Sequence, residues 1–299
     1  MKEGVIIKGI SGFYYVKVDN SLYECKARGV FRKKGLSPLV GDRVSISIID
    51  EASKKGNIDK IYDRKTELLR PPIANIDKVL ITFSIKEPNP NMVLLDRFIV
   101  FSEKENLDIR IILTKIDLDR DGTIVGRIVS DYEKIGYRVI PTSIKTGQGI
   151  DELRQELSGC VSVFAGQSGV GKSSILNAIN PDFKLDTAEI SHKLGRGKHT
   201  TRHSQLYEIE QGAIVADTPG FSSFDLKNIE IEDLQDYFIE FAKYEGCRFA
   251  NKCIHKNEPD CAVKEALELG EISESRYRSY LQILDEINNL KSRELRRNI

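Results

Sequence analysis

The 299-residue sequence contains no long hydrophobic run, no low-complexity tract and no internal repeat. A helix that crosses a bilayer needs about 20 predominantly apolar residues in succession. No segment approaches that length, so we expect no contact with a membrane. The N-terminus lacks a charged leader followed by an apolar block and a small-residue cleavage site, which predicts no signal peptide and a cytoplasmic protein. With 40% hydrophobic and 30% charged residues, the composition is typical of a soluble globular chain.

The sequence also lacks net charge, because 45 Lys and Arg balance 45 Asp and Glu. The two signs are unevenly distributed along the chain. Residues 1–70 hold 15 Lys and Arg against 9 Asp and Glu, and the rest of the chain is mildly acidic. A basic N-terminal segment favours a polyanionic partner. The alternative is that these charges only keep the protein soluble.

Cysteine is scarce, and the five residues are an odd number. A cytoplasmic chain has no reason to pair them as disulfides. Cys25 and Cys160 are isolated in the sequence, which predicts buried packing thiols. The other three lie within fifteen residues of one another, beside a histidine.

Residues 1–68 contain five short runs rich in β-branched and aromatic residues, bounded by Gly, Asn and Asp. Apolar residues alternate in the segments 14–18 and 44–48, as in strands with one buried face. This pattern predicts an all-β barrel of the OB type, a common platform for nucleic acid. Basic residues surround Phe31 in the segment 28–35. A basic loop with an aromatic residue can contact phosphates and stack on a base, and a merely solvated loop is an equal alternative.

The pattern changes after residue 68. Pro71-Pro72 predicts a linker. Apolar strand-like runs then alternate with segments of helical periodicity, which predicts an α/β domain over 69–225 with helices on both faces of a parallel sheet. Residues 226–299 carry apolar positions at helical spacing and are predicted to form a third, mainly helical domain.

The segment GQSGVGKS matches the P-loop pattern G-x-x-x-x-G-K-[ST] in full and lies between a predicted strand and a predicted helix. Its glycines let the backbone N–H groups and the helix N-terminus surround phosphates. Lys172 would neutralise the β- and γ-phosphates as a catalytic group, and the Ser173 hydroxyl would bind Mg²⁺. The predicted phosphate-binding residues are Gly166, Gln167, Ser168, Gly169, Val170, Gly171, Lys172, Ser173 and Ser174.

A second phosphate-facing motif, DTPG, follows an apolar strand about 45 residues downstream of the P-loop. The Asp217 carboxylate at that strand end can hold Mg²⁺ through water. The Gly220 N–H can contact the γ-phosphate. D-x-x-G is a weak motif alone and becomes informative after a P-loop.

Two further segments predict that the base is guanine. In TKID, the Asp117 carboxylate can accept hydrogen bonds from guanine N1–H and its 2-amino group, whereas adenine has no such pair of donors. The stem of Lys115 can lie along the purine face. The segment SIK resembles the S-A-K loop, whose backbone N–H near Ile144 would reach guanine O6. The predicted base-binding residues are Thr114, Lys115, Asp117, Ser143, Ile144 and Lys145.

The order of these motifs is unusual. GTPases generally run P-loop, switch I, D-x-x-G, N-K-x-D and S-A-K, whereas this chain runs TKID, SIK, P-loop, switch I and DTPG. The motifs therefore describe a circularly permuted GTPase domain. With the flanking segments, the chain resembles the ribosome small-subunit-dependent GTPase A family over essentially its whole length. The resemblance implies an OB domain, a permuted GTPase domain and a C-terminal zinc domain. Thr114 stands where general GTPases commonly have Asn.

Switch I is expected in the segment between the P-loop and DTPG. A threonine there would contact Mg²⁺ and the γ-phosphate in the GTP state. Thr200 and Thr201 are both candidates, and we favour Thr201 as the Mg²⁺ ligand. Phe221 stands where many GTPases have the glutamine that orients the attacking water, so unaided hydrolysis should be slow. We hypothesise that His199, or a group on a bound partner, orients that water.

The remaining cysteines form C-x5-C-x-H-x5-C. Three thiolates and one imidazole suit a closed, structural Zn²⁺ site with no open position for catalysis. Agreement with the family pattern supports this interpretation over scattered thiols. The predicted ligands are Cys247, Cys253, His255 and Cys261.

The resemblance implies a GTPase that binds the 30S ribosomal subunit and its rRNA and hydrolyses GTP to GDP and phosphate during late small-subunit maturation. The cofactors would be one structural Zn²⁺, and Mg²⁺ with GTP. The residues 221–225 would carry nucleotide state into the C-terminal domain, and we expect a monomer. Two alternatives stay open: an RNA-binding protein that uses GTP as a structural ligand, and a GTPase that acts on another RNA or protein.

Overall fold

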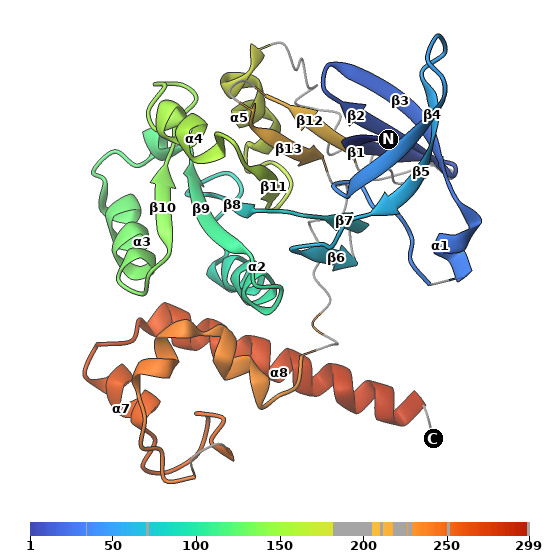
Figure 1. Cartoon of the computed structure of the whole chain (residues 1–299). Helices are drawn as coiled ribbons and strands as arrows, with labels where there is room; N and C mark the ends of the chain where they lie inside the picture. The colour runs from blue at the N-terminus through green and yellow to red at the C-terminus, as the bar shows by residue number, and fades with distance from the viewer. Residues whose placement is uncertain are drawn as a thin grey trace. The chain divides into compact units, whose positions relative to one another are not determined.

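The structure is a computed structural model of the whole chain (Figure 1). It describes residues 1–33, 35–69, 72–181, 205–209, 212–217, 226, 229–249 and 252–297. The chain forms two compact units, which are described separately. The first comprises Met1–Leu80 and Gln148–Ser222, and the second comprises Ile81–Gly147 and Ser223–Ile299.

The N-terminal part of the first unit is a closed five-stranded barrel. Its strands pair in the order β1-β2-β3-β5-β4, and β4 pairs with β1 to close the ring. Val16, Tyr23 and Ile58 are fully buried inside it, so the alternation in the sequence marks its inner face. The predicted OB-type barrel is therefore confirmed. The strands are β1 Lys2–Ile10, β2 Phe13–Val18, β3 Ser21–Ala27, β4 Arg43–Asp50 and β5 Lys55–Ile61.

The segment around Phe31 differs from its prediction. It forms a short helix, α1 Gly29–Lys33, and only 7% of Phe31 is exposed. A buried ring cannot stack on a base, so the predicted role of this aromatic was wrong. The Arg28 guanidinium lies 2.6 Å from the Asp59 carboxylate. The physical reason is burial, because an apolar ring gains free energy when it leaves water.

The chain that leaves the barrel stays attached to it. Pro72 begins β7 Pro72–Ala74, which forms a hairpin with β6 Glu67–Leu69, where the proline pair predicted a linker. Arg64 donates two hydrogen bonds to the fully buried Asp42, at 2.7 and 2.9 Å. The Ala74 N–H donates to the Val40 carbonyl at 2.8 Å. A β-carbon on Gly41 would lie 1.9 Å from the Ala74 carbonyl oxygen, so only glycine fits there.

The rest of the first unit carries the P-loop. Strands β11 and β13 are parallel, β12 is antiparallel to β13, and β12 also pairs with β1 through Gln205 and Lys8. The side chain of Asp77 accepts a hydrogen bond from the Val161 N–H at 2.9 Å, which holds the start of β11. The elements are α4 Ile150–Leu157, β11 Val161–Ala165, α5 Lys172–Ile179, β12 Gln205–Glu208 and β13 Ile214–Asp217.

The second unit joins an α/β segment to the C-terminal helices. Strand β8 Lys78–Ser84 enters it from the first unit, and its strand order is β10-β9-β8, with β9 and β10 parallel. Helix α8 packs against α2 (Figure 1). The elements are α2 Met92–Lys104, β9 Asp108–Thr114, η1 Ile116–Leu118, α3 Thr123–Glu133, β10 Arg138–Pro141, η5 Asp233–Tyr237, η6 Ile239–Lys243, α7 Ala262–Glu268 and α8 Glu274–Arg297.

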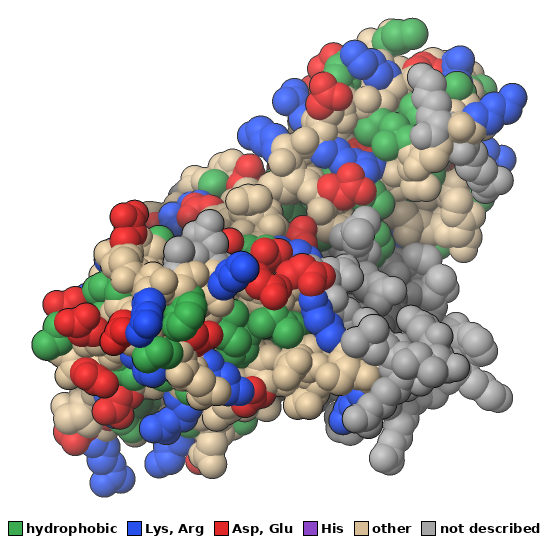
Figure 2. Space-filling model, turned by 90° about the horizontal axis from the view of Figure 1, so that it is seen from below, with side chains coloured by type: hydrophobic (Ala, Val, Ile, Leu, Met, Phe, Trp, Pro, Cys, Tyr) green, Lys and Arg blue, Asp and Glu red, His purple; other side chains and the backbone are tan. Residues whose placement is uncertain are grey.

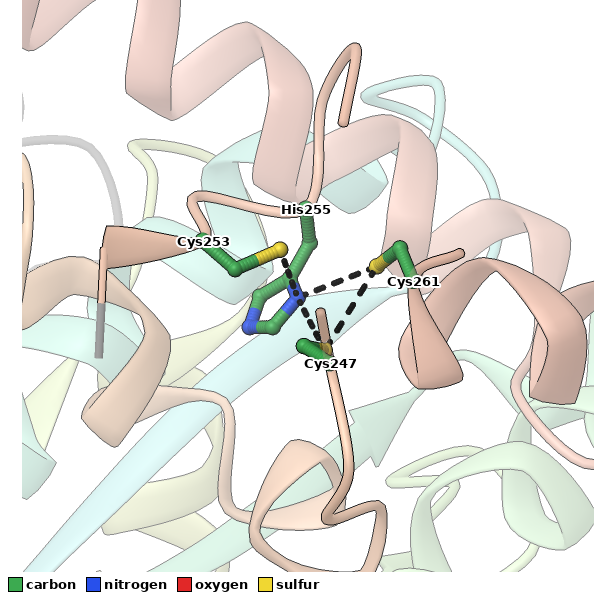
Figure 3. A group of neighbouring side chains, drawn as sticks. All are labelled: Cys247, Cys253, His255 and Cys261. Atoms are coloured by element: carbon green, nitrogen blue, oxygen red, sulfur yellow. Dashed lines mark hydrogen bonds between the residues drawn. The ribbon is translucent and has the colours of Figure 1, made fainter. Parts of the chain in front are cut away.

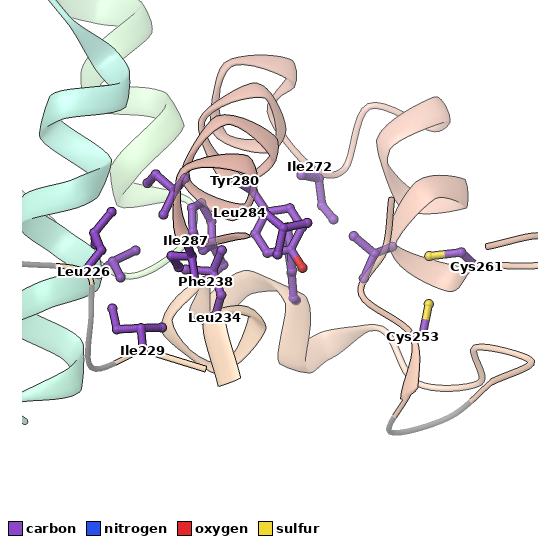
Figure 4. Packing of buried hydrophobic residues seen from close by; sticks show 14 of the residues in the cluster. Leu226, Ile229, Leu234, Phe238, Cys253, Cys261, Ile272, Tyr280, Leu284 and Ile287 are labelled. Atoms are coloured by element: carbon purple, nitrogen blue, oxygen red, sulfur yellow. The ribbon is translucent and has the colours of Figure 1, made fainter. Parts of the chain in front are cut away.

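A hydrophobic cluster forms the core of the C-terminal part (Figure 4). Phe238 and Tyr280 are fully buried in it, as are Ile283 and Ile287 on the inner face of α8. Val100 of α2 belongs to the same cluster, so this core includes residues from both chain segments of the unit. The apolar positions at helical spacing, which predicted a mainly helical domain over 226–299, mark the side of α8 that faces this core.

Acidic and basic side chains are interspersed on the face shown in Figure 2. Among the described residues, exposed ion pairs include Arg248 with Asp260 at 3.2 Å, where both side chains are more than 60% exposed. Such pairs contribute only about 0–1 kcal/mol, so packing rather than surface charge holds the fold. Among the described helices, none is long and apolar enough to cross a bilayer.

Candidate nucleotide site and metal centre

The P-loop connects β11 to α5. Gly166, Gly169 and Gly171 have φ angles of +135°, +81° and +105°. Side chains rarely tolerate this half of conformational space, which explains why the motif needs glycine there. The loop ends at the N-terminus of α5, where backbone N–H groups have no partner within the helix. This arrangement can bind an anion.

Lys172 is the first residue of α5, and its side chain folds back over the loop. Its Nζ donates to the carbonyl oxygens of Gly166 at 2.6 Å and Gln167 at 2.7 Å. Burial lowers the pKa of this ammonium group to about 8. Ser173, next to it, is 9% exposed, and Val170 is buried. The lysine is therefore held at the loop by neutral oxygens in surroundings that would favour an anionic ligand.

The predicted base-binding residues lie where β9 and β10 end, in the second unit. The Ser143 hydroxyl donates to the Asp117 Oδ1 at 2.7 Å. The Thr146 N–H donates to the same hydroxyl oxygen at 3.3 Å. Because the oxygen accepts from the backbone, its own proton is directed toward the carboxylate. The structure thus brings together the TKID and SIK segments, which are 26 residues apart.

The neighbouring residues have distinct environments. Thr114 is 2% exposed at the end of β9, and Ile144 is 45% exposed. Lys115 has a left-handed backbone with φ of +59°, and its Nζ donates to the Glu87 carbonyl. The Ile116 N–H donates to the Thr142 carbonyl at 3.3 Å and links the two loops. Lys145 is exposed. Sequence reasoning gave no sign of the role of Glu87 because it lies outside any motif.

Several predicted residues lie outside the described part of the structure. These include all the switch I candidates, the glycine of DTPG and the residue that follows it. For Asp217 the backbone ends β13, but its side chain is not described. The predictions for the segment 221–225 therefore stay predictions. The residues concerned are His199, Thr200, Thr201, Gly220 and Phe221.

The four predicted metal ligands converge in the C-terminal part (Figure 3). The His255 Nδ1 lies 3.7, 3.4 and 3.2 Å from the sulfur atoms of Cys247, Cys253 and Cys261. The Cys247 and Cys261 sulfur atoms are 3.9 Å apart. All four ligand atoms lie within 4.8 Å of one another, so the cluster can hold a metal ion.

The other nitrogen of His255 has a partner that the sequence did not reveal. The Gln235 Oε1 lies 2.7 Å from His255 Nε2. The amide nitrogen of Gln235 donates to the Glu232 carbonyl at 2.9 Å, which leaves its oxygen to accept from the imidazole. A proton on Nε2 leaves the Nδ1 lone pair free to face the three sulfur atoms.

The loop that carries the ligands is tied to its surroundings. The Glu258 carboxylate accepts the N–H groups of Ile254, Lys256 and Asn257 at 2.8 to 3.1 Å. The Tyr280 hydroxyl donates to the Ile254 carbonyl at 2.7 Å. Burial raises the pKa of the Cys253 thiol to about 12. A bound cation would reverse that effect, because metal binding deprotonates thiols.

Two family models match the chain over most of its length. The RsgA N-terminal domain matches residues 3–58, and the RsgA GTPase model matches residues 61–227. The chain belongs to the RsgA GTPase family. It is therefore a GTPase, as its P-loop and base-binding motifs predicted, and the predicted family resemblance is confirmed.

Relatives and solved structures of the RsgA family agree with this assignment. The small ribosomal subunit biogenesis GTPase RsgA of Alkaliphilus metalliredigens is 51% identical over 288 residues, which cover 96% of this chain and 98% of that protein. The crystal structure of YjeQ from Thermotoga maritima matches with a TM-score of 0.83 at 38% identity and covers 96% of this chain and 98% of its own. YloQ, described as a circularly permuted GTPase, matches with a TM-score of 0.79 at 39% identity over 97% and 96% of the two chains. The predicted permuted fold is confirmed.

Proposed function

We propose that this GTPase acts in biogenesis of the small ribosomal subunit, where it binds the 30S particle and hydrolyses GTP to GDP and phosphate during late maturation. The observation that carries the proposal is full-length similarity: a small ribosomal subunit biogenesis GTPase covers 96% of this chain at 51% identity. A second such relative, from Geobacillus thermodenitrificans, covers 98% at 50% identity. Similarity of this extent includes the barrel and the C-terminal part as well as the GTPase motifs.

We assign the nucleotide contacts by the chemistry of each motif. Lys172 has three N–H donors, two of which contact loop carbonyls in the structure, and phosphate oxygens would attract this cation. Ser173 and Thr201 would bind Mg²⁺, which would neutralise charge on the phosphates. Asp117 would accept hydrogen bonds from guanine with the carboxylate oxygen that Ser143 does not hold. His199, or a group on the 30S partner, would orient the attacking water.

We assign the metal centre to one structural Zn²⁺. In a tetrahedral site with Zn–S of about 2.3 Å and Zn–N of about 2.0 Å, ligand atoms lie about 3.5 to 3.8 Å apart. The three distances from His255 Nδ1 to the sulfur atoms and the Cys247–Cys261 distance run from 3.2 to 3.9 Å, close to that geometry. Three thiolates favour Zn²⁺ over the harder Mg²⁺ or Ca²⁺. Four protein ligands leave no open position, so the metal would support the fold rather than take part in hydrolysis.

The two flanking domains would supply the contacts to rRNA. The barrel carries the positive surplus of the sequence, and lysines lie over aromatic rings on it, such as Lys26 over Phe13 at 5.0 Å. Such pairs suit phosphates and bases together. We keep the domain boundaries 1–68, 69–225 and 226–299 as a proposal, with a cytoplasmic location and a monomeric state.

Two measurements test the proposed function. GTP hydrolysis is followed with and without purified 30S particles, and 30S co-sedimentation is compared with a non-hydrolysable GTP analogue and with GDP. We expect 30S-stimulated turnover and analogue-dependent co-sedimentation, both lost in Lys172→Ala. Binding to 30S without stimulated hydrolysis would instead identify an RNA-binding protein that uses GTP as a structural ligand. Hydrolysis without 30S association would point to another target.

A further inference from the structure

Arg276 of α8 is an unusually placed charge. Its side chain is 1% exposed, and its guanidinium donates to the Glu240 carboxylate through Nε at 2.8 Å and Nη2 at 2.9 Å. Nη1 lies 2.5 Å from the Asp96 carboxylate. Both acidic side chains are buried as well. Removal of one member of a buried ion network leaves the others without compensation, which is far more costly than the loss of a surface pair.

The partners of Arg276 come from both chain segments of the second unit. Asp96 lies on α2, and Tyr132 of α3 donates from its hydroxyl to the same Asp96 oxygen at 2.8 Å. The guanidinium also lies over the rings of Tyr132 at 5.6 Å and Phe238 at 4.5 Å. One buried cation thus fastens two helices of the GTPase segment to the C-terminal segment.

The same residue is connected to the metal cluster by packed rings. Phe238, beneath the guanidinium, contacts Tyr280 edge to face with centroids 5.1 Å apart. Tyr280 contacts Phe241 at 5.0 Å, and Phe241 contacts the ring of the ligand His255 at 5.6 Å. Cys253 and Cys261 share one hydrophobic cluster with these rings and with Val100 of α2 (Figure 4). All four rings of this series are buried.

In the other direction, the two helices precede the strands that end at the predicted base-binding residues. Helix α2 is followed by β9, after which come Lys115 and Asp117. Helix α3 is followed by β10, after which comes Ser143. The Leu107 N–H donates to the Ser102 carbonyl at 3.0 Å, so the connection from α2 to β9 is tight. These short connections give a direct route by which the packing of α2 and α3 can affect the position of the Asp117 carboxylate.

We propose that Arg276 couples the metal centre to guanine recognition, so that a bound metal ion stabilises α2 and α3 and thereby raises affinity for guanine nucleotides. Arg276 is a positioning residue that touches neither ligand. The coupling to affinity rests on the proposed role of Asp117 in base binding. The coupling to helix stability does not, because it depends only on contacts within the second unit.

Amide hydrogen exchange tests whether the bound metal stabilises α2 and α3. Amide exchange in α2 and α3 is compared between metal-stripped protein and protein reloaded with Zn²⁺, for the wild type and for Arg276→Met. We expect Zn²⁺ to slow exchange in both helices by about 100-fold in the wild type. In Arg276→Met, Zn²⁺ should still bind with one ion per chain and slow amide exchange in residues 247–261. Exchange in α2 and α3 of this variant should be the same with and without Zn²⁺. Equal exchange in α2 and α3 with and without metal in the wild type would overturn the proposal.

GDP affinity, measured in the same samples, tests whether the metal also strengthens nucleotide binding. Metal removal from the wild type should weaken GDP binding about tenfold, and Arg276→Met should weaken it similarly with metal present. The matched control is Arg97→Met, which removes a partly exposed ion pair with Glu286 between the same helices α2 and α8; it should change neither readout. Unchanged GDP affinity in Arg276→Met would overturn the coupling. If the metal-loaded wild type binds no GDP, the proposed base-binding role fails, and the exchange data still decide the helix coupling.

Discussion

Ser143 orients the carboxylate of Asp117 through one hydroxyl group. Its oxygen accepts the Thr146 N–H, so its proton is directed to Asp117 Oδ1. Under the proposed base-binding role, the second carboxylate oxygen is the one left to accept from guanine. Because the direction of these hydrogen bonds fixes the orientation of the carboxylate, the effect of a substitution at residue 117 can be predicted.

In Asp117→Asn, the amide oxygen should take the place beside the Ser143 hydroxyl, because only an oxygen can accept its proton. The amide NH₂ group then faces the base and repels the N1–H and 2-amino donors of guanine. Loss of hydrogen bonds to a charged group costs about 1.5–3 kcal/mol, so GTP affinity should fall by about 10- to 100-fold.

Xanthine has a carbonyl at position 2, which accepts from the amide, so XTP affinity should rise in the same variant. Fluorescence titration with labelled GTP and XTP measures both affinities. The control Asp119→Asn, two residues further on, should leave the preference for guanine unchanged. Equal loss of both nucleotides in Asp117→Asn would contradict the assigned geometry.

Lys172 predicts a pH dependence of nucleotide binding. Burial lowers the pKa of its ammonium group to about 8, and bound phosphates raise it again. Below about pH 8 the free protein already holds this proton, and affinity should be flat. Above that pH the free protein loses the proton first, so affinity should fall by up to about tenfold per pH unit.

Calorimetry in two buffers of different ionisation enthalpy measures the proton uptake directly. At about pH 8.5, GDP binding should take up more than half a proton per site, whereas at about pH 6.5 it should take up almost none. Absence of uptake at the higher pH would show that Lys172 keeps its charge in the free protein.

Gln235 predicts an effect on metal retention. Gln235→Leu removes the acceptor that holds the proton on His255 Nε2, so the imidazole should lose its fixed orientation toward the sulfur atoms. Partners of this kind typically change metal affinity by about 10- to 100-fold. Competition with a chromogenic chelator measures the affinity. Gln282→Leu, on the exposed face of α8, is the matched control and should retain metal like the wild type.

At the scale of elements, patterns of contiguous residues predicted the strands and the positions of the motifs well. The alternation in the first 68 residues predicted the barrel strands, and the P-loop and TKID predicted their own settings at strand ends, because each depends on neighbours a few residues away. Phe31 was misjudged because its burial depends on the rest of the barrel. Gln235, 20 residues from His255, could not be found from spacing, since a glutamine carries no motif.

The junction between barrel and hairpin leaves no room for a side chain at Gly41. Gly41 combines a φ of +94° with a β-carbon position 1.9 Å from the Ala74 carbonyl oxygen. Gly41→Ala should therefore destabilise the protein by more than about 3 kcal/mol, because backbone must move. Gly12 has a similar φ of +85° but open space around it. Gly12→Ala should therefore destabilise the protein by only about 1 kcal/mol of backbone strain.

Urea denaturation of both variants measures the difference. A loss in Gly41→Ala no greater than that in Gly12→Ala would mean that the hairpin does not approach the barrel this closely in solution.

At the scale of the whole molecule, the unequal distribution of charge predicts how binding to 30S depends on salt. Each phosphate contact releases about one counterion, so removal of one contact lowers the slope of log affinity against log salt by about one. Lys26→Gln should do so, because this lysine is exposed over Phe13. Lys54→Gln is the control, since its Nζ already lies 2.7 Å from the Glu51 carboxylate.

Co-sedimentation over a series of salt concentrations measures both slopes. Equal slopes for Lys26→Gln and the wild type would remove this face of the barrel from the contact with rRNA.

The buried cation of α8 also has a consequence for the order of synthesis. Asp96 and Arg276 are 180 residues apart, so the ribosome translates the carboxylate long before its partner. Domains generally fold as they emerge, N-terminal parts first, yet α2 and α3 cannot bury Asp96 at low cost until α8 has left the exit tunnel. The first unit ends at Ser222, so all of its residues are translated before Arg276. A nascent chain stalled before residue 276 should therefore contain a folded barrel and incompletely packed base-binding residues, so that only the completed chain of this GTPase binds its nucleotide tightly.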